Sequence, residues 1–201
     1  MDNTPPVITS TTPTTNQKID NTAYLAVNAS DASGIRSADW YLQTTQGPVR
    51  IGSGQRTYWG CGGLNGNYTI LVNVTDLVGN VATRTVPVEI RSPDLSVEGV
   101  SFVPIVPAVN YSNAVKVSIK NKGSLNADNF YARLYVGYNE TNNTLIDQIL
   151  PDQVIEAVLY WTPRTAGPHN ITVVVDPVDY VSESNETNNY MTMSIDIPGE
   201  K

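Results

Sequence analysis

The residues of this chain best suited to chemistry are the acids and amides that follow Val175. Four carboxylates and one amide lie close together there: Asp176, Asp179, Glu183, Glu186 and Asn188. Calcium in proteins takes about six to eight oxygen ligands in adaptable geometry, and these side chains with nearby carbonyls supply enough of them. Their spacing matches no EF-hand loop, and the same residues equally suit Asx turns and the satisfaction of loop amides. The sequence therefore predicts a loop that either binds calcium or caps the neighbouring strands.

Other residues that could do chemistry are few and scattered. Asp31, Asp76 and Asn80 form a second, sparser set of calcium-type ligands. His169 is the single histidine and Cys61 the single cysteine. Because no nucleophile–base pair, phosphate loop or zinc set accompanies them, we expect no enzyme and no required cofactor, with Ca²⁺ as the one ion to test. Cys61 has no basic neighbour that would lower its pKa, so an inert loop cysteine is expected.

Tyr58 and Trp59 stand at the start of a glycine-rich run, Tyr58–Gly63 (YWGCGG), that is expected to be a loop. Two adjacent aromatic rings in an exposed loop could stack on a sugar. They support an alternative function, in which the chain is a carbohydrate-binding or positioning appendage of a secreted hydrolase.

Asparagines in the pattern Asn-x-Ser/Thr are unusually frequent. With 20 Asn and 35 Ser plus Thr in the chain, chance predicts about half the number observed. Such sequons are acceptors for N-linked glycans on exposed surfaces of exported proteins. The sequence therefore predicts glycosylation at Asn28, Asn67, Asn73, Asn110, Asn139, Asn142, Asn170 and Asn185.

Short alternating runs, separated by Gly, Pro and Asn, indicate the elements that must position these residues. Tyr68, Ile70, Val72 and Val74 fall on one face of such a run, and no stretch of ten or more residues has sustained helical periodicity. This pattern is typical of strands in an all-β sandwich. The acidic loop falls between two such runs, at about 167–175 and 190–197.

The alternating runs form two sets separated by the short linker Arg91–Asp94, where Pro93 cannot continue a sheet ladder. The pattern GPHNITV at Gly167 repeats GNYTILV at Gly66, which indicates a tandem arrangement. We therefore predict an all-β fold of two immunoglobulin-like β-sandwiches, residues 1–91 and 92–201, joined by a short linker.

Composition and charge exclude several classes of partner. The net charge is −7 and the chain has only 12 Lys and Arg, so a basic patch for nucleic acid is not available. No run of apolar residues is long enough to span a membrane. One cysteine allows no intrachain disulfide. We interpret the chain as a segment of a longer polypeptide, whose neighbouring domains are its first partners.

The second half, residues 92–201, resembles the CARDB family, the cell-adhesion-related domains of bacterial and archaeal surface proteins. Motifs that carry the resemblance are Pro93–Leu95 (PDL), Asn121–Gly123 (NKG), Trp161–Pro163 with Ala166–Gly167, Val175–Pro177 (VDP) and Glu183–Asn189 (ESNETNN). The first half is similar to a prokaryotic immunoglobulin-like repeat through Asp2–Ile8, Asp31–Ile35 and Val74–Asn80.

Both resemblances imply a non-catalytic sandwich from an extracellular or cell-surface protein. We therefore predict a structural or adhesion module, acting as a spacer or interaction repeat of a glycoprotein of a prokaryote, an archaeon in particular. Expected partners are other surface proteins, glycans, and further copies that pair through edge strands.

Overall fold

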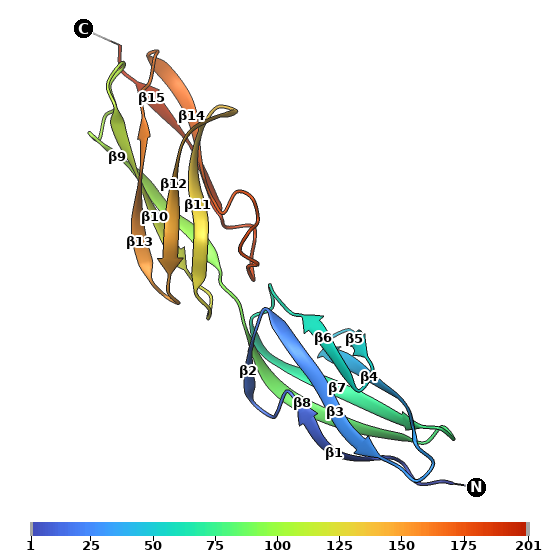
Figure 1. Cartoon of the computed structure of the whole chain (residues 1–201). Coiled ribbons are helices and arrows are strands. Elements are labelled where there is room, and N and C mark those ends of the chain that lie inside the picture. Colours follow the sequence, from blue (N-terminus) through green and yellow to red (C-terminus); the bar gives the residue numbers. More distant parts are fainter. Residues whose placement is uncertain (1, 200–201) are drawn as a thin grey trace. The chain divides into compact units, whose positions relative to one another are not determined.

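The computed structural model describes residues 2–199 and divides the chain into two compact units, Met1–Arg91 (unit 1) and Ser92–Lys201 (unit 2). Every regular element in the described residues is a β-strand (Figure 1). None of these residues forms a helix long and apolar enough to cross a membrane. The prediction of an all-β fold is confirmed.

Unit 1 is a sandwich of a three-stranded and a five-stranded sheet. Its strands are β1 (Val7–Thr12), β2 (Gln17–Asp20), β3 (Thr22–Ser30), β4 (Ile35–Thr44), β5 (Gly47–Ser53), β6 (Arg56–Gly60), β7 (Gly66–Asp76) and β8 (Val81–Arg91). One sheet has the order β1-β3-β6 and the other β2-β8-β7-β4-β5. All pairs are antiparallel except β2 with β8, which is parallel.

The core of unit 1 lies between these sheets, because alternate residues of each strand face the opposite sheet. Trp40 on β4 is fully buried, and its indole N–H donates to the Gly54 carbonyl at 3.0 Å. Ile70, Val72 and Val74 of β7 are also fully buried, as their alternation predicts.

Unit 2 packs a three-stranded sheet against a four-stranded one. Its strands are β9 (Leu95–Val103), β10 (Asn113–Asn121), β11 (Ala127–Val136), β12 (Asn139–Ile149), β13 (Val154–Trp161), β14 (Gly167–Val175) and β15 (Tyr190–Ile197). The sheet orders are β13-β10-β9 and β12-β11-β14-β15, with every pair antiparallel. Phe130, Leu134 and Leu159 lie at the centre of the core between them.

The sequence prediction is wrong in one segment of unit 1. Tyr58–Gly60 was expected in a loop, but residues 56–60 form β6 and pair with β3. The neighbouring strand β5 contains Gly52 and pairs with β4 around a bulge. Residues 56–59 do alternate, since Thr57 and Trp59 face inward while Arg56 and Tyr58 face solvent. The run is short and flanked by glycines, which are uncommon in strands, so the alternation does not stand out in the sequence.

Candidate functional site

The chain enters unit 2 through residues 92–95, termed the lead segment, which is hydrogen-bonded from two sides. On one side is the turn after β10. The Ser124 N–H donates to the Ser92 carbonyl at 3.0 Å, and the Lys122 N–H donates to the Asp94 carbonyl at 2.6 Å. The Asp94 N–H in turn donates to the side-chain oxygen of buried Asn121 at 3.1 Å. This turn therefore satisfies the lead segment's backbone on that side.

Gly123 lets the turn approach so closely. A Cβ at this position would collide with the Ser92 carbonyl oxygen and the Pro93 carbonyl carbon. Asn121 holds the turn in place, since its amide donates to the carbonyls of Leu125 at 2.8 Å and Ile149 at 3.1 Å. The NKG motif is thus explained by contact with the lead segment.

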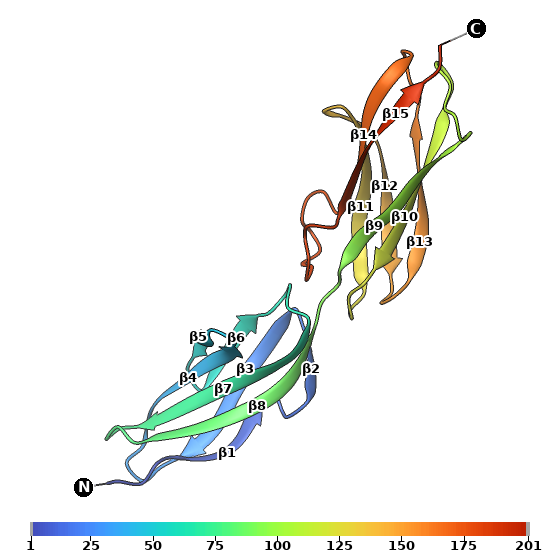
Figure 2. The same cartoon turned by 180° about the vertical axis from the view of Figure 1, so that it is seen from behind.

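On the other side lies the acidic loop, residues 176–189, which joins β14 to β15 (Figure 1). Glu183 accepts the N–H of Leu95 through Oε2, and the Ser184 N–H donates to the Pro93 carbonyl at 2.9 Å. The Asn188 side-chain amide donates to the Asp94 carboxylate at 2.7 Å. Figure 2 shows the loop from behind, at the end of unit 2 where β9 begins. The turn and the acidic loop together form a clamp around the lead segment.

Inside the acidic loop, the carboxylates accept backbone N–H groups. The Asp176 carboxylate accepts from Tyr180 at 3.1 Å and from Val181 at 2.7 Å. Glu186 Oε1 accepts the N–H of Glu183 at 2.9 Å. Asp176 adopts a positive φ of 46°, which Asp tolerates better than most residues. The acids therefore fix the shape of the loop.

Glu183 lies in an environment that disfavours its charge. Its side chain is 4% exposed, and burial raises its pKa to about 8, with nearby Glu186 and Asp176 adding to the rise. The N–H of Leu95 and the Asn189 amide, which donates at 2.7 Å, oppose that rise. None of the ion pairs among residues 2–199 includes Glu183. The clamp thus contains a carboxyl that is readily protonated.

The residues predicted to bind calcium are divided between the interior and the surface of unit 2. Asp176 and Glu183 are buried, Asp179 and Glu186 are exposed, and Asn188 is half-buried. The side chains of Asp176, Glu183 and Glu186 already accept hydrogen bonds from backbone N–H groups. This geometry agrees with the capping alternative, and calcium binding at the loop stays a prediction.

A second set of carboxylates converges in unit 1. Side-chain oxygens of Asp2, Asp31 and Asp76 lie within 4.8 Å of one another. Asp31 and Asp76 belong to the second set of ligands expected from the sequence, whereas Asp2, from the start of the chain, does not. Although burial alone would raise the pKa of Asp76, N–H donors from Val78, Gly79 and Asn80 hold it below its ordinary value. Calcium chemistry is available to this set, since all its ligands are oxygen.

The two residues predicted to stack on sugar point to different sides of β6. Tyr58 is 73% exposed, whereas Trp59 is half-buried and packs against the core of unit 1. Tyr58 instead pairs with Tyr24 on β3, with ring centroids 5.0 Å apart. The sequence does not indicate Tyr24 as the partner of Tyr58, because only the register of β3 and β6 brings the two rings together.

The eight sequons divide by exposure. Six asparagines are exposed: Asn28, Asn67, Asn110, Asn139, Asn170 and Asn185. Asn73 and Asn142 are half-buried, and their side-chain oxygens accept from the Thr83 hydroxyl at 2.7 Å and the Tyr160 N–H at 3.1 Å. Access for a modifying enzyme therefore differs among them.

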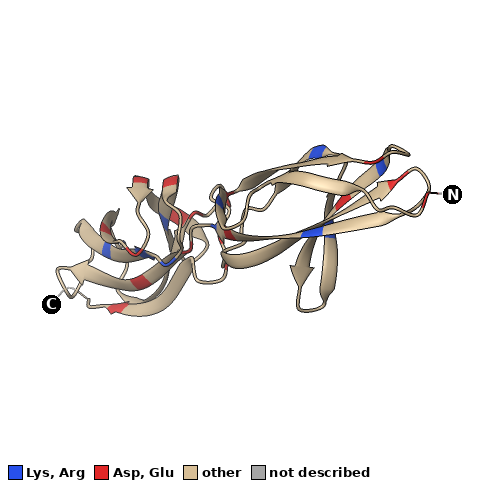
Figure 3. Cartoon of the chain, turned by 90° about the horizontal axis from the view of Figure 1, so that it is seen from below, with Lys and Arg blue, Asp and Glu red and all other residues tan. Residues whose placement is uncertain are grey.

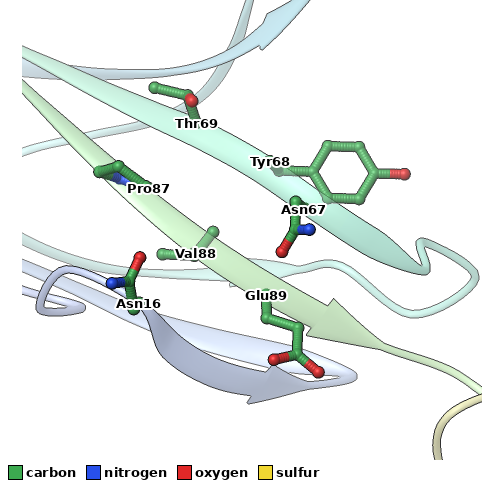
Figure 4. A pocket seen from close by; sticks show the side chains of 7 residues that line it. All are labelled: Asn16, Asn67, Tyr68, Thr69, Pro87, Val88 and Glu89. Carbon is green, nitrogen blue, oxygen red and sulfur yellow. The ribbon is translucent and has the colours of Figure 1, made fainter.

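Asn67 also lines a pocket of about 450 Å³ in unit 1 (Figure 4). Asn67 and Glu89 are register partners on β7 and β8, and both side chains face this hollow. Asn16, Tyr68, Thr69, Pro87 and Val88 complete the lining. The pocket has amide and carboxylate groups but none of the predicted calcium or stacking residues.

Two further features bear on reactivity and charge. Cys61 is 1% exposed and free, and burial raises the pKa of its thiol, so it is a poor nucleophile. Among residues 2–199, seven Lys and Arg side chains form ion pairs with acids. In the view of Figure 3, Lys and Arg are scattered rather than gathered on one face.

Comparison with protein families identifies two segments. Residues 92–193 match the CARDB family model, and residues 6–72 match the model described as a bacterial Ig domain. The resemblances inferred from the sequence motifs are confirmed by these matches. No curated protein matches the chain.

Solved structures similar to this chain include three from prokaryotes. A CARDB domain from Pyrococcus furiosus, solved with di-metal ions, has 29% identity and a TM-score of 0.48, with coverage of 53% of this chain and 94% of that chain. A domain of a predicted cell surface protein from Methanosarcina acetivorans has 27% identity and a TM-score of 0.48, with coverage of 54% and 95%. Fibronectin(III)-like modules from Clostridium thermocellum have 15% identity and a TM-score of 0.35, with coverage of 96% and 93%.

Proposed function

Since this chain belongs to the CARDB family, we propose that it is a load-bearing structural module of a cell-surface or secreted protein. CARDB and bacterial Ig domains are typical of cell-surface proteins and are typically non-catalytic. The two sandwiches would hold other domains or partners apart while resisting extension of the chain.

The clamp is the observation that carries this proposal. Tension applied through the chain reaches unit 2 at Ser92, directly after β8 of unit 1 ends at Arg91. The bonds to Ser92, Pro93, Asp94 and Leu95 must break before β9 can be peeled from β10. Each such bond contributes about 1 kcal/mol to stability. Because all of them lie where tension enters unit 2, they resist that tension at the same time.

The proposed setting is the outside of a prokaryotic, in particular archaeal, cell, on a glycosylated protein. Support comes from the excess of sequons and from the exposure of six of their asparagines. A low content of charged residues, 15%, leaves polar uncharged faces on which glycans could be carried.

The proposed partners are neighbouring domains, other surface proteins or glycans, and further copies of the chain. In unit 2 the acidic loop covers the start of the open edge of β9, because the Leu95 N–H donates to Glu183 and the Val97 N–H donates to the Asn188 carbonyl at 3.1 Å. The edge strand β15 has neither Pro nor Lys and pairs with β14 without a bulge. Such an edge suits pairing with another strand. Sedimentation that shows only monomers at high concentration would remove self-association from the proposal.

Calcium is proposed as an accessory ion that stabilises the acidic loop. We expect the melting temperature of unit 2 to rise in millimolar Ca²⁺ and to fall with a chelator, because weak sites of this kind suit extracellular modules. Asp179→Asn should reduce the shift. A rise confined to unit 1, abolished by Asp31→Asn, would place the ion at Asp2, Asp31 and Asp76 instead.

Force spectroscopy on the full chain tests the load-bearing function. Unit 1 and unit 2 should give separate unfolding events, and the event of unit 2 should require less force in the Glu183→Ala and Asn188→Ala variants. Glu156→Ala is the matched control, since its carboxylate forms only an exposed ion pair with Lys116. Equal unfolding forces in all four proteins would refute the proposal.

A further inference from the structure

An exposed aromatic pair lies on the outer face of the three-stranded sheet of unit 1. Tyr24 of β3 and Tyr58 of β6 are direct cross-strand partners, with ring centroids 5.0 Å apart and planes tilted by 44°. Tyr58 is 73% exposed and Tyr24 is 39% exposed. The pair therefore leaves a large aromatic area in solvent, although cross-strand packing explains part of its presence.

A pocket of about 280 Å³ adjoins this pair, and Tyr24 forms one of its walls. The volume is near the lower end of ligand pockets, roughly 300–1,000 Å³. Its polar lining comes from the end of β1, from β2 and from the start of β3: Thr12, Gln17, Lys18, Asp20 and Thr22. The sheet order β1-β3-β6 places Tyr24 between the pocket's β1 side and Tyr58, so pocket and rings form one continuous surface.

The charges in the pocket are already balanced by the protein. Lys18 lies 3.5 Å from the Glu89 carboxylate, and Asp20 accepts two hydrogen bonds from Arg91 at 2.8 and 2.9 Å. A charged ligand would find no complementary free charge there. Amide and hydroxyl groups remain to recognise an uncharged ligand rich in hydroxyls.

We propose that this surface binds an uncharged oligosaccharide, with one sugar ring in the pocket and the following rings over Tyr24 and Tyr58. Aromatic faces stack on the apolar face of a sugar ring, while hydroxyl and amide side chains bond to its edges. Glycans are among the proposed partners, so this inference rests on the proposed function and deepens it by naming a binding surface and a class of glycan. Unit 1 would attach the module to a neutral glycan, while unit 2 bears the load.

Binding is tested with the full chain, produced without glycosylation because Asn28 lies on the same face of β3. Calorimetry against a panel of neutral hexose oligosaccharides should detect binding. NMR shifts on adding the bound sugar should map to residues 12–24 and 56–60. Tyr58→Ala should weaken affinity roughly tenfold through loss of stacking, and Gln17→Ala should weaken it through loss of an edge contact.

Two matched controls keep the outcome clear. Tyr138→Ala removes a fully exposed tyrosine from unit 2 and should leave binding unchanged. Uronic-acid oligosaccharides should bind no better than neutral ones. The proposal is overturned if no neutral oligosaccharide binds, if Tyr58→Ala binds like wild type, or if only uronates bind and Arg56→Ala abolishes that binding.

Discussion

The buried carboxylate of Glu183 accepts the backbone N–H of Leu95, a residue 88 positions earlier in the chain. This bond joins the last loop of unit 2 to its first strand. Leu95 is fully buried at the start of the edge strand β9, where its N–H would otherwise lack a partner. The acid therefore has a structural task at the point where the chain enters the unit.

The burial of Glu183 predicts a particular pH dependence. Its pKa is about 8 in the folded unit, against 4.5 for an ordinary Glu, so the folded state prefers the protonated carboxyl. The resulting stability is fully present below pH 4.5 and is lost as the pH rises through 8. We expect the free energy of unfolding of unit 2 to fall by up to about 5 kcal/mol across this range. Urea denaturation of the full chain, followed through NMR signals of unit 2, measures it.

Glu183→Gln is the control for that pH dependence, because the amide has a similar shape and never ionises. The variant should flatten the pH profile of unit 2 and should exceed wild type in stability at alkaline pH. Identical profiles for the two proteins would show that Glu183 is not the titrating group.

Asp76 predicts the opposite behaviour in unit 1. Its donors hold its pKa below the ordinary 3.8, so its contribution is present above that pH and is lost as the pH falls through the lower folded value. Asp76→Asn should cost unit 1 about 1–3 kcal/mol at neutral pH, because the backbone N–H groups of Val78, Gly79 and Asn80 lose a charged, buried acceptor. Asp39→Asn, which breaks an exposed ion pair with Arg50, should cost less than about 1 kcal/mol. Equal losses would contradict this assignment.

Gly123 should tolerate no side chain. Gly123→Ala should destabilise unit 2 by at least about 2 kcal/mol, because the new methyl group collides with the backbone of the lead segment. Gly99→Ala in β9 is the matched control, since a Cβ there meets nothing within 4 Å. Thermal unfolding of both variants compares them, and a neutral Gly123→Ala would mean that the turn does not press on the lead segment.

Glycosylation should follow exposure if the protein is modified after folding. We expect glycans on the exposed set of sequons, such as Asn185, and bare side chains at Asn73 and Asn142. The two bare residues are held by bonds from Thr83 and Tyr160. Peptide mass spectrometry of native material checks each site. Full occupancy of Asn73 and Asn142 would contradict the expectation.

The sequence predicts the fold well because alternation reports burial directly. Val72 and Leu134 face the cores of their sandwiches as their patterns require. The prediction fails at Tyr58, because this residue lies in a short strand with glycines on both sides. That strand, β6, is recognisable only by its pairing with β3.

The chemistry of the acidic loop was only partly predictable. The residue types indicate oxygen ligands or amide acceptors, and local sequence cannot separate the two roles. The decisive partner of Glu183 is Leu95, which only the sandwich topology brings near. Asp2 meets Asp31 and Asp76 for the same reason, since β-sheet order and not sequence distance determines these contacts.

Hydrogen exchange at the Leu95 amide tests the clamp most directly. In the native full chain we predict that this amide exchanges as slowly as those of β10, the central strand of its sheet. In Glu183→Ala it should exchange about tenfold faster or more, while the Val117 amide on β10 is unchanged. Exchange of Leu95 in the wild-type protein at the rate of an unstructured backbone would contradict the clamp.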